Sequence, residues 1–500
     1  MPPIVPASSR SSAFGADVLT LVSGTTIAQI ITILSAPIVT RLYGPATFGL
    51  LALFTSIISI VGVIACMRYE LAIMLTKSDE EAANVLGLCL IFVLIVSIVS
   101  AIPLILFQQS LVLFLKAPLL GPFLWLIPPT LLVSGIYLAF TYWNNRKKQF
   151  YRLSLVMVIG SFSSTAAQLV LGYLGHATGG ALIGASILAQ IVSILLLGIQ
   201  IIRDHLSFFK QNISWSGMNH VLKRYSNFPK YDIWSALLNT LSWQIPIFLL
   251  AYFFSTTVVG YYSLGMMVIQ LPMNFIGSAI AQVFYQRAVA AKQDGTISIL
   301  VENVFKVLIV IGLFPILILT IIGQNIFSVI FGTVWAEAGV YTQIISVWAL
   351  IWFISSPLST IYIVFEKQEF GLKYNVVNFF TRLGSLIIGG LLGSPVIALL
   401  LFASSGIFVY GYLGFTMLEY SHVKRSHSIK IIATNVLMFL PAGIVLGIMK
   451  IAGINSLVLV ITAIIFCLIY YIYIVRTDPE IKTLAMTVGP LKKIVSAIQK

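Results

Sequence analysis

The sequence predicts an all-α polytopic membrane protein of about fourteen transmembrane helices, arranged as two parallel six-helix lobes around a central cavity with two additional C-terminal helices. Three observations predict this fold class: long apolar segments recur along the whole chain, only 9 % of the residues are charged, and the mean hydropathy is +1.02. A span takes roughly 20 mostly apolar residues in a helix, because backbone polar groups must be paired within the bilayer.

The fourteen expected spans follow one another with short loops between them. In chain order they are about 18–39, 48–67, 84–107, 121–142, 154–175, 181–202, 232–253, 260–282, 305–324, 341–364, 373–392, 396–418, 431–449 and 456–475. With both termini in the cytoplasm, nearly all Lys and Arg residues fall on the inward side, and the outward side keeps only Arg41, Lys116 and Lys450. This asymmetry is the positive-inside bias, so the net charge of +14 indicates membrane topology and not nucleic-acid binding.

Two short echoes in the sequence predict an internal repeat. TFGLLAL at 47–53 matches VVGYYSL at 258–264, and a weaker echo joins LGYLG at 171–175 to GGLLG at 389–393. The predicted order is a cytoplasmic N-terminal tail over 1–16, an N-lobe over 17–202, a cytoplasmic linker over 203–230, a C-lobe over 231–418, helices 13 and 14 over 419–475 and a basic cytoplasmic tail over 476–500. The tail segment PLKKIVSAIQK either lies on the inner membrane surface or frays.

Arg382 is the clearest charged residue within an expected span. A charge at mid-bilayer costs at least about 2.5 kcal/mol, so it requires a polar cavity or a partner. Asn375, Asn378, Arg382 and Ser385 share one helix face, and the acidic residues of the chain lie in loops or near helix ends. We therefore expect Arg382 to meet an anionic ligand, phosphate above all; an internal ion pair and snorkelling to the interface are the alternatives.

Polar stripes also occur on other expected spans, and their convergence predicts a polar substrate-binding cavity between the lobes. Their candidate members are Thr25, Gln29, Thr32, Tyr137, Thr141, Asn239, Ser242, Gln270 and Asn274. Each stripe alone has a simpler interpretation, since such side chains also hold helices together across dry interfaces.

Motifs of enzymatic chemistry are missing from the sequence. It contains no phosphate-binding loop, no G-x-S-x-G, no H-E-x-x-H and no paired carboxylates within a span, and its five histidines lack metal-ligand spacing. The three cysteines, Cys66, Cys89 and Cys467, fall in spans, where neither a disulfide framework nor a zinc site is expected. The sequence thus favours a gradient-driven transporter without cofactor or metal over an enzyme, and leaves proton or sodium open as coupling ion.

Two stretches resemble a known family. The run TRLYGPATFGLLALFTSIISIVGVIACMRYELAIML with the following DEEAANVLGL, and the later LSWQIPIFLLAYFFSTTVVGYYSLGMMVIQLPMNFIGSAIAQVFYQRA, resemble Wzx-type lipid-linked oligosaccharide flippases. These form the polysaccharide transporter branch of the multidrug/oligosaccharidyl-lipid/polysaccharide exporter (MOP) superfamily. The resemblance covers helices 1 to 12 and implies two six-helix bundles facing a central cavity.

The resemblance also implies a function, a location and partners. It implies that an undecaprenyl-diphosphate-linked oligosaccharide is moved from the cytoplasmic to the outer leaflet of a bacterial inner membrane by alternating access. The product would feed O-antigen, lipopolysaccharide, capsule or exopolysaccharide synthesis. The partners that the resemblance implies are membrane lipid, a polysaccharide polymerase and a chain-length regulator. Arg382 would supply the cationic point for the diphosphate.

Several positions in the two stretches are candidates for gates or hinges. Arg41, Arg68 and Glu70 stand at helix ends in matching signature positions, with ordinary interfacial anchoring as the alternative. The other candidates are two prolines expected to kink their helices and two glycines that start equivalent helices of the lobes, namely Pro246, Pro272, Gly49 and Gly260.

Competing functions remain at this point. The nearest competing function is that of a drug or metabolite exporter of the same superfamily. An exporter of the major facilitator type is disfavoured, because the loop RYELAIMLTKSDEEAAN lacks the usual signature. A polysaccharide polymerase or ligase would resemble its relatives in having a large outward loop, which this sequence lacks. A scaffold without transport activity stays open.

Overall fold

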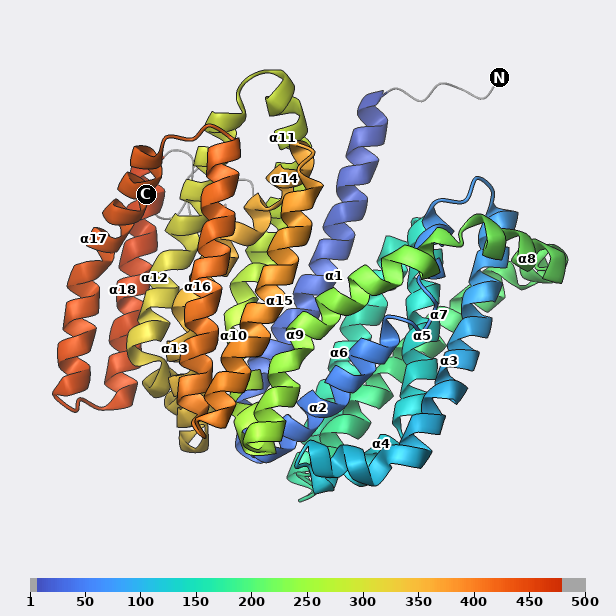
Figure 1. Ribbon diagram of the computed structural model, residues 1–500, viewed down its shortest axis with the longest axis horizontal. Coiled ribbons are helices and arrows are strands. Elements are labelled where there is room, and N and C mark those ends of the chain that lie inside the picture. The colour runs from blue at the N-terminus through green and yellow to red at the C-terminus, as the bar shows by residue number, and fades with distance from the viewer. Residues whose placement is uncertain (1–6, 479–500) are drawn as a thin grey trace. The chain divides into compact units, whose positions relative to one another are not determined.

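The computed structural model describes residues 7–478, with side chains from residue 23 onward except at positions 276, 278, 279, 282, 283 and 286. Every regular element in this part of the chain is a helix (Figure 1). The segment PLKKIVSAIQK and residues 1–6 lie outside the described residues. Contacts divide the chain into two compact units with the boundary between Gly260 and Tyr261; the predicted lobe limits near 203–230 stay a prediction.

The first unit contains the helices up to the start of α10. They are α1 (Ala7–Leu42), α2 (Pro45–Gly62), η1 (Tyr69–Met74), α3 (Asp79–Phe114), η2 (Pro118–Leu120), α4 (Gly121–Leu124), α5 (Ile127–Arg146), α6 (Phe150–Tyr173), α7 (Gly179–Asn212), α8 (Trp215–Arg224), η3 (Phe228–Asp232), α9 (Ile233–Phe253) and α10 (Thr256–Pro272), which crosses the boundary. Within it α1 packs on α6, α6 on α7, and α5 on both α3 and α7.

Local chemistry fixes where these helices start. Ser78 caps α3 by accepting a hydrogen bond from the backbone N–H of Glu81, and three acidic residues in the first turn complement the positive end of the helix dipole. Pro45 stands at the first position of α2, where a missing N–H is harmless. Tyr43 and Gly44 therefore form the short connection between α1 and α2.

The second unit is built around two buried helices. Its elements are η4 (Met273–Gly277), α11 (Ser278–Gln293), α12 (Ile297–Phe331), η5 (Thr333–Trp335), α13 (Ala336–Leu358), α14 (Thr360–Val364), α15 (Gln368–Leu391), α16 (Pro395–Tyr420), α17 (Arg425–Ile451) and α18 (Ser456–Thr477). Within an 18-residue apolar stretch of α12, and of Thr333–Val364 around α13, 61 % of the residues are buried, against 17 % in α17 and 28 % in α18. The pair α12–α13 is thus the core of this unit, with α17 and α18 packed on α12.

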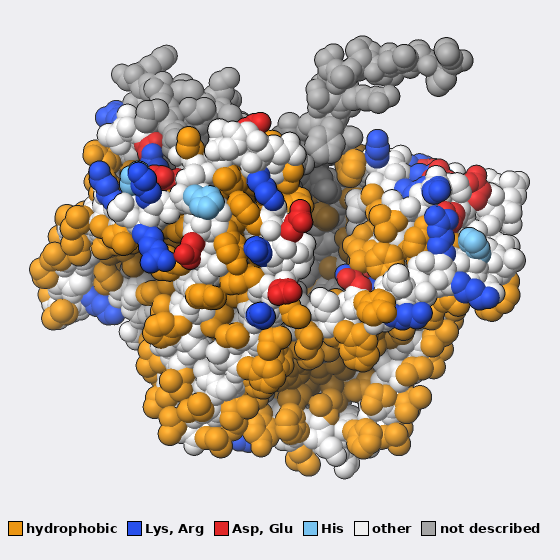
Figure 2. Space-filling view, turned by 45° about the horizontal axis from the view of Figure 1, so that its top comes forward, with side chains coloured by type: hydrophobic (Ala, Val, Ile, Leu, Met, Phe, Trp, Pro, Cys, Tyr) orange, Lys and Arg blue, Asp and Glu red, His pale blue; other side chains and the backbone are white. Residues whose placement is uncertain are grey.

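The prediction of an all-α polytopic membrane protein is confirmed. Among the described residues, 11 helices are long and apolar enough to cross a membrane, and the bent pair Pro118–Leu124 with Ile127–Arg146 raises this to 12. The two remaining expected spans, 260–282 and 373–392, coincide with α10–η4–α11, which is interrupted after Pro272, and with α15, which carries Arg382 and two asparagines. Hydrophobic side chains cover much of the visible surface, as lipid contact requires (Figure 2).

Candidate functional site

Arg382 points into the second unit and is 2 % exposed. Its Nη2 donates a hydrogen bond of 3.0 Å to the hydroxyl of Tyr410 on α16. The guanidinium carbon lies 5.5 Å from the ring centres of Trp348 on α13 and Phe402 on α16, and 5.6 Å from that of Tyr410. We call Trp348, Phe402 and Tyr410 the aromatic cage of Arg382.

The cage explains how a guanidinium can be buried here. Ring faces attract a cation, and a guanidinium is more weakly hydrated than an ammonium and stacks flat on aromatic rings. Phe402 and Trp348 also contact each other edge to face, with ring centres 5.0 Å apart. An anion could reach the guanidinium only after Tyr410 or α15 moves, because little of the side chain is open to solvent.

α15 buries one of its sides and exposes another. Asn378 and Ser385 are buried on the same side as Arg382, whereas Val376, Val377 and Phe380 on the other side are 45, 51 and 62 % exposed. Asn375, one turn before Asn378, is exposed.

The polar side faces α13 and α16 of the same unit. Its environment at Arg382 is aromatic, whereas the sequence predicted a polar cavity or a partner there. Sequence reasoning did not identify Trp348, Phe402 and Tyr410, because aromatic residues within spans are too common to single out.

The MRYELAI segment forms the second polar site, in the first unit. α2 ends at Gly62, and Met67 and Arg68 both adopt left-handed backbone angles, with φ of 52° and 64°. Such angles are uncommon for residues other than glycine and reverse the chain before η1. They aim Arg68 at two carboxylates: its Nε donates to Asp232 Oδ2 at 2.6 Å, and its Nη1 donates to Glu70 Oε1 at 3.3 Å.

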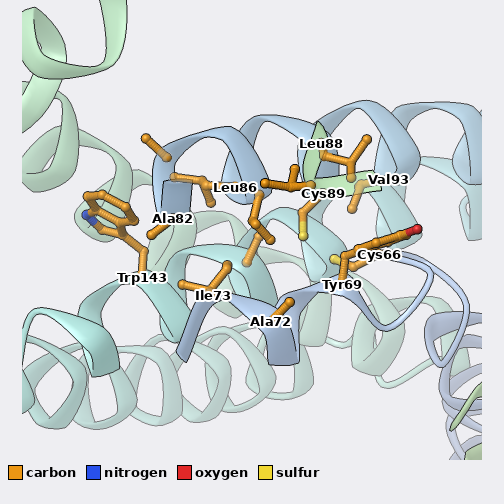
Figure 3. Packing of buried hydrophobic residues seen from close by; sticks show 14 of the residues in the cluster. Cys66, Tyr69, Ala72, Ile73, Ala82, Leu86, Leu88, Cys89, Val93 and Trp143 are labelled. Atoms are coloured by element: carbon orange, nitrogen blue, oxygen red, sulfur yellow. The ribbon is translucent and has the colours of Figure 1, made fainter. Parts of the chain in front are cut away.

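The neighbouring residues of the segment are core residues. Tyr69, Ala72 and Ile73 are buried against α3 and α5, together with Cys66 and Cys89 (Figure 3). The Tyr69 ring stacks on Phe92, with centres 5.6 Å apart. The packing therefore holds the carboxylate of Glu70 away from water.

Glu70 is 1 % exposed, and burial raises the pKa of its carboxyl above the ordinary value, against the lowering effects of a backbone hydrogen bond and of Arg68. Within the described part of the chain, its Oε2 has no hydrogen-bond partner. The arrangement favours a carboxyl group that holds a proton more tightly than an exposed glutamate does.

Asp232 is a site residue that the sequence did not single out. It closes η3 directly before α9, so its ion pair with Arg68 joins the start of η1 to the start of α9. Asp79, also not singled out, accepts from Arg146 Nε at 2.9 Å and from Lys147 Nζ at 2.5 Å. The sequence did contain a sign of the Asp79 contacts, because the acidic DEEAAN and the basic NNRKK segments are expected on the same side of the membrane.

The hydroxyl groups of most other candidates bond locally. Thr32 donates to Ala28 O, Thr141 to Tyr137 O and Ser242 to Leu238 O, each one turn back along its own helix. Thr25 donates to the sulfur of Met157 at 3.5 Å, which links α1 to α6. Of the other polar candidates, Asn239 and Asn274 are exposed, whereas Gln29, Tyr137 and Gln270 are half-buried.

The remaining hinge candidates lie at helix ends or bends. Pro246 is buried within α9, and Pro272 ends α10 directly before the π-helical turn η4. Arg41 is in the last turn of α1 and exposed. Gly49 and Gly260 are buried in close backbone contact.

Among the described residues, no group of three or more His, Cys, Asp or Glu side chains could hold a metal ion.

Comparison with known proteins gives a matching family model, one relative by sequence and several solved structures. A family model described as "Polysaccharide biosynthesis protein" matches residues 38–340, more than half of the chain. The Escherichia coli (strain K12) protein "Lipopolysaccharide biosynthesis protein WzxC" is 24 % identical over 195 residues, which are 38 % of this chain and 39 % of WzxC. The alignment thus spans well under half of that relative's length.

Two solved structures share the fold. "Lipid II flippase MurJ, inward closed conformation" matches with a TM-score of 0.68 at 14 % identity, over 90 % of this chain and 98 % of that one. An inward-facing multidrug resistance MATE family transporter of the MOP superfamily matches with a TM-score of 0.59 at 16 % identity, over 80 % and 96 % of the two chains. At these identities the likeness establishes the fold.

Proposed function

The chain belongs to this polysaccharide biosynthesis protein family, and from that premise we propose that it is a Wzx-type secondary transporter that flips a lipid-linked oligosaccharide. The substrate is an undecaprenyl-diphosphate-linked repeat unit, moved from the inner to the outer leaflet of the bacterial cytoplasmic membrane by alternating access. Both termini are cytoplasmic, and the product serves O-antigen, capsule or exopolysaccharide synthesis.

One observation carries the proposal: a fold shared over 90 % of the chain with a protein named as a lipid II flippase. Together with the family, it supports a lipid-linked sugar as substrate and transport rather than enzymatic chemistry. A multidrug exporter of the same superfamily is the second candidate, supported by the MATE likeness, which is weaker in both TM-score and coverage.

We assign the contact with the substrate diphosphate to Arg382. A guanidinium presents paired donors that match phosphate oxygens. Because Tyr410 covers it, the assignment requires the aromatic cage to open when the substrate binds. Asn378 and Ser385 lie on the same face of α15 and offer hydrogen-bonding groups for the sugar.

The ion pair between Arg68 and Asp232 is our candidate for a gate. It joins the start of η1 to the start of α9, and both side chains are partly exposed, 25 % and 40 %. An exposed ion pair is worth at most about 1 kcal/mol, which suits a contact that must break and reform in each transport cycle.

The experiment that tests the function uses the full chain reconstituted in liposomes with a fluorescent undecaprenyl-diphosphate oligosaccharide. We expect quenching from outside to show protein-dependent movement of the label between leaflets. Arg382→Ala, inserted and folded as judged by its unfolding midpoint, should transport far more slowly; near-normal transport by this variant would sink the assignment of Arg382.

The same liposomes separate the two candidate functions. If the protein leaves the lipid-linked sugar in place but moves cationic drugs when a proton or sodium gradient is imposed, it is an exporter. In cells, deletion of the gene should leave undecaprenyl-diphosphate sugars in the cytoplasmic leaflet, and normal flipping with new drug sensitivity contradicts the flippase function.

A further inference from the structure

α12 is broken within the second unit, and the two backbone carbonyls before the break accept hydrogen bonds from side chains of other helices. Ile322 has φ of −119° and ψ of 20°, outside the helical range, in the middle of a 35-residue helix. A helical carbonyl normally accepts from the N–H four residues on, so a residue with non-helical angles turns the carbonyls before it away from their partners. Carbonyls at such breaks are the groups with which transporters bind cations inside the membrane.

A cation from the same chain occupies this break. Lys450 Nζ donates to Ile321 O at 2.8 Å, and Gln343 Nε2 on α13 donates to the same oxygen at 2.7 Å and to Thr320 O at 2.9 Å. Next to them, the hydroxyls of Thr320 and Ser346 lie 2.7 Å apart. The ammonium group therefore stands against a carbonyl oxygen within a polar shell built from α12 and α13.

The position of Lys450 in α17 supports a cation at this point. It lies in the last turn of the helix, where the negative end of the helix dipole favours positive charge. Lys450 makes no ion pair with a carboxylate among the described residues, and its ammonium group donates instead to the carbonyl of Ile321. Lys450 is also one of three basic residues on the expected outward side, where topology alone disfavours Lys and Arg.

We propose that the break in α12 forms a monovalent-cation site at the backbone carbonyl of Ile321, and that the ammonium of Lys450 is its resident, tethered cation. In this proposal α17 carries the cation, and α17 and α18 together stabilise the broken form of α12. Asn325, three residues after Ile322, bonds Ser456 at the start of α18 at 2.9 Å and fixes the hairpin at the same level. The inference does not depend on the identity of the transported substrate.

The test is chemical rescue of the full-length protein in detergent or nanodiscs. Lys450→Ala removes the three carbons and the ammonium group beyond Cβ. These atoms correspond to propylammonium. We expect the unfolding midpoint to fall by roughly 2–4 °C and to recover when propylammonium is added, because the free amine restores both the charge and the N–H donor. Propanol, which has the same length but no charge, should not restore it.

Three further samples decide the outcome. Lys450→Arg should keep the native midpoint, since it keeps a cationic donor, whereas Lys450→Met should lose stability although it keeps the hydrocarbon chain. Lys430→Ala, at the exposed start of the same helix, is the matched control and should neither lose stability nor respond to propylammonium.

A native midpoint for Lys450→Met overturns the proposal, as does equal rescue by propanol or no rescue by the amine. If Lys450→Ala does not fold, the comparison of Lys450→Met with Lys450→Arg decides. Equal midpoints for those two variants also overturn it.

Discussion

Gly49 and Gly260 lie with their backbones against each other at the first turns of α2 and α10: a Cβ on either would stand 3.2 Å from the amide nitrogen of the other. The same added carbon on Gly49 would collide with Thr256 O, and on Gly260 with Pro45 O. Backbone atoms cannot turn away as side chains do, so only glycine allows this approach. The two helices that the sequence paired as counterparts are thus in direct contact.

Gly49→Ala should push α2 and α10 apart. We expect a loss of about 1–3 kcal/mol in the free energy of unfolding, the usual range for overpacking, seen as a lower unfolding midpoint and lower yield in the membrane. Gly62→Ala is the control, because a Cβ there meets nothing within 4 Å. Equal midpoints for the two variants would show that the helices can separate without loss.

Glu70 should make stability depend on pH. Burial raises the pKa of its carboxyl, so the folded protein keeps this proton to a higher pH than the unfolded chain does. Stability from this group is therefore complete below the ordinary carboxyl pKa and is lost as pH rises through the raised value. Unfolding midpoints of native protein and Glu70→Gln, measured from pH 4 to about pH 8, should differ in slope, with the variant flatter.

The control for this measurement is Asp294→Asn, which changes an exposed carboxylate at the end of α11. It should leave the slope of the native protein unchanged. A Glu70→Gln slope equal to the native one would mean that the buried carboxyl does not titrate in the folded protein.

Tyr410→Phe tests the aromatic cage of Arg382. The substitution removes the 3.0 Å hydrogen bond to Nη2 but keeps a ring over the guanidinium, so we expect a loss of about 0.5–1.5 kcal/mol in unfolding free energy. If the cage must open for the substrate, the transport rate of Tyr410→Phe should not decrease in proportion to its unfolding free energy. Tyr412→Phe, two residues on and 64 % exposed, should change neither property.

The sequence predicted the fold better than it predicted the sites. Apolar length and charge asymmetry sufficed for the spans, because the bilayer imposes one secondary structure and a minimum length. The face of α15 that carries Arg382 followed from spacing alone. What lies opposite that face did not, since contacts between α15 and α16 or α13 depend on helix packing, which periodicity does not encode.

The breaks within helices were also beyond the sequence analysis. The expected span 48–67 overran the end of α2 at Gly62, because the residues that follow are as apolar as the helix. Arg68, at the end of the left-handed turn that follows, pairs with Asp232, a residue 164 positions away. Beside the break at Ile322, the carbonyl of Ile321 accepts from Lys450, 129 positions away, and local sequence identifies neither pairing.

Tyr471 compensates for a proline in α12. Pro315 has no N–H, so the carbonyl of Ile311 lacks its helical donor, and Tyr471 of α18 supplies a hydrogen bond of 2.6 Å to that oxygen. Tyr471→Phe should lower the free energy of unfolding by about 0.6 kcal/mol, and by no more than about 1.7 kcal/mol, the range for hydrogen bonds between membrane helices.

A double-mutant cycle with Pro315→Ala separates this cause from general packing. Alanine at 315 restores the N–H donor, so in that background Tyr471→Phe should have a much smaller effect than in the native chain. Tyr473→Phe, on the same helix and 51 % exposed, is the control and should have no effect in either background. An equal loss from Tyr471→Phe with and without Pro315 would mean that its hydroxyl stabilises α18 through some other contact, and that the bend of α12 does not rely on it.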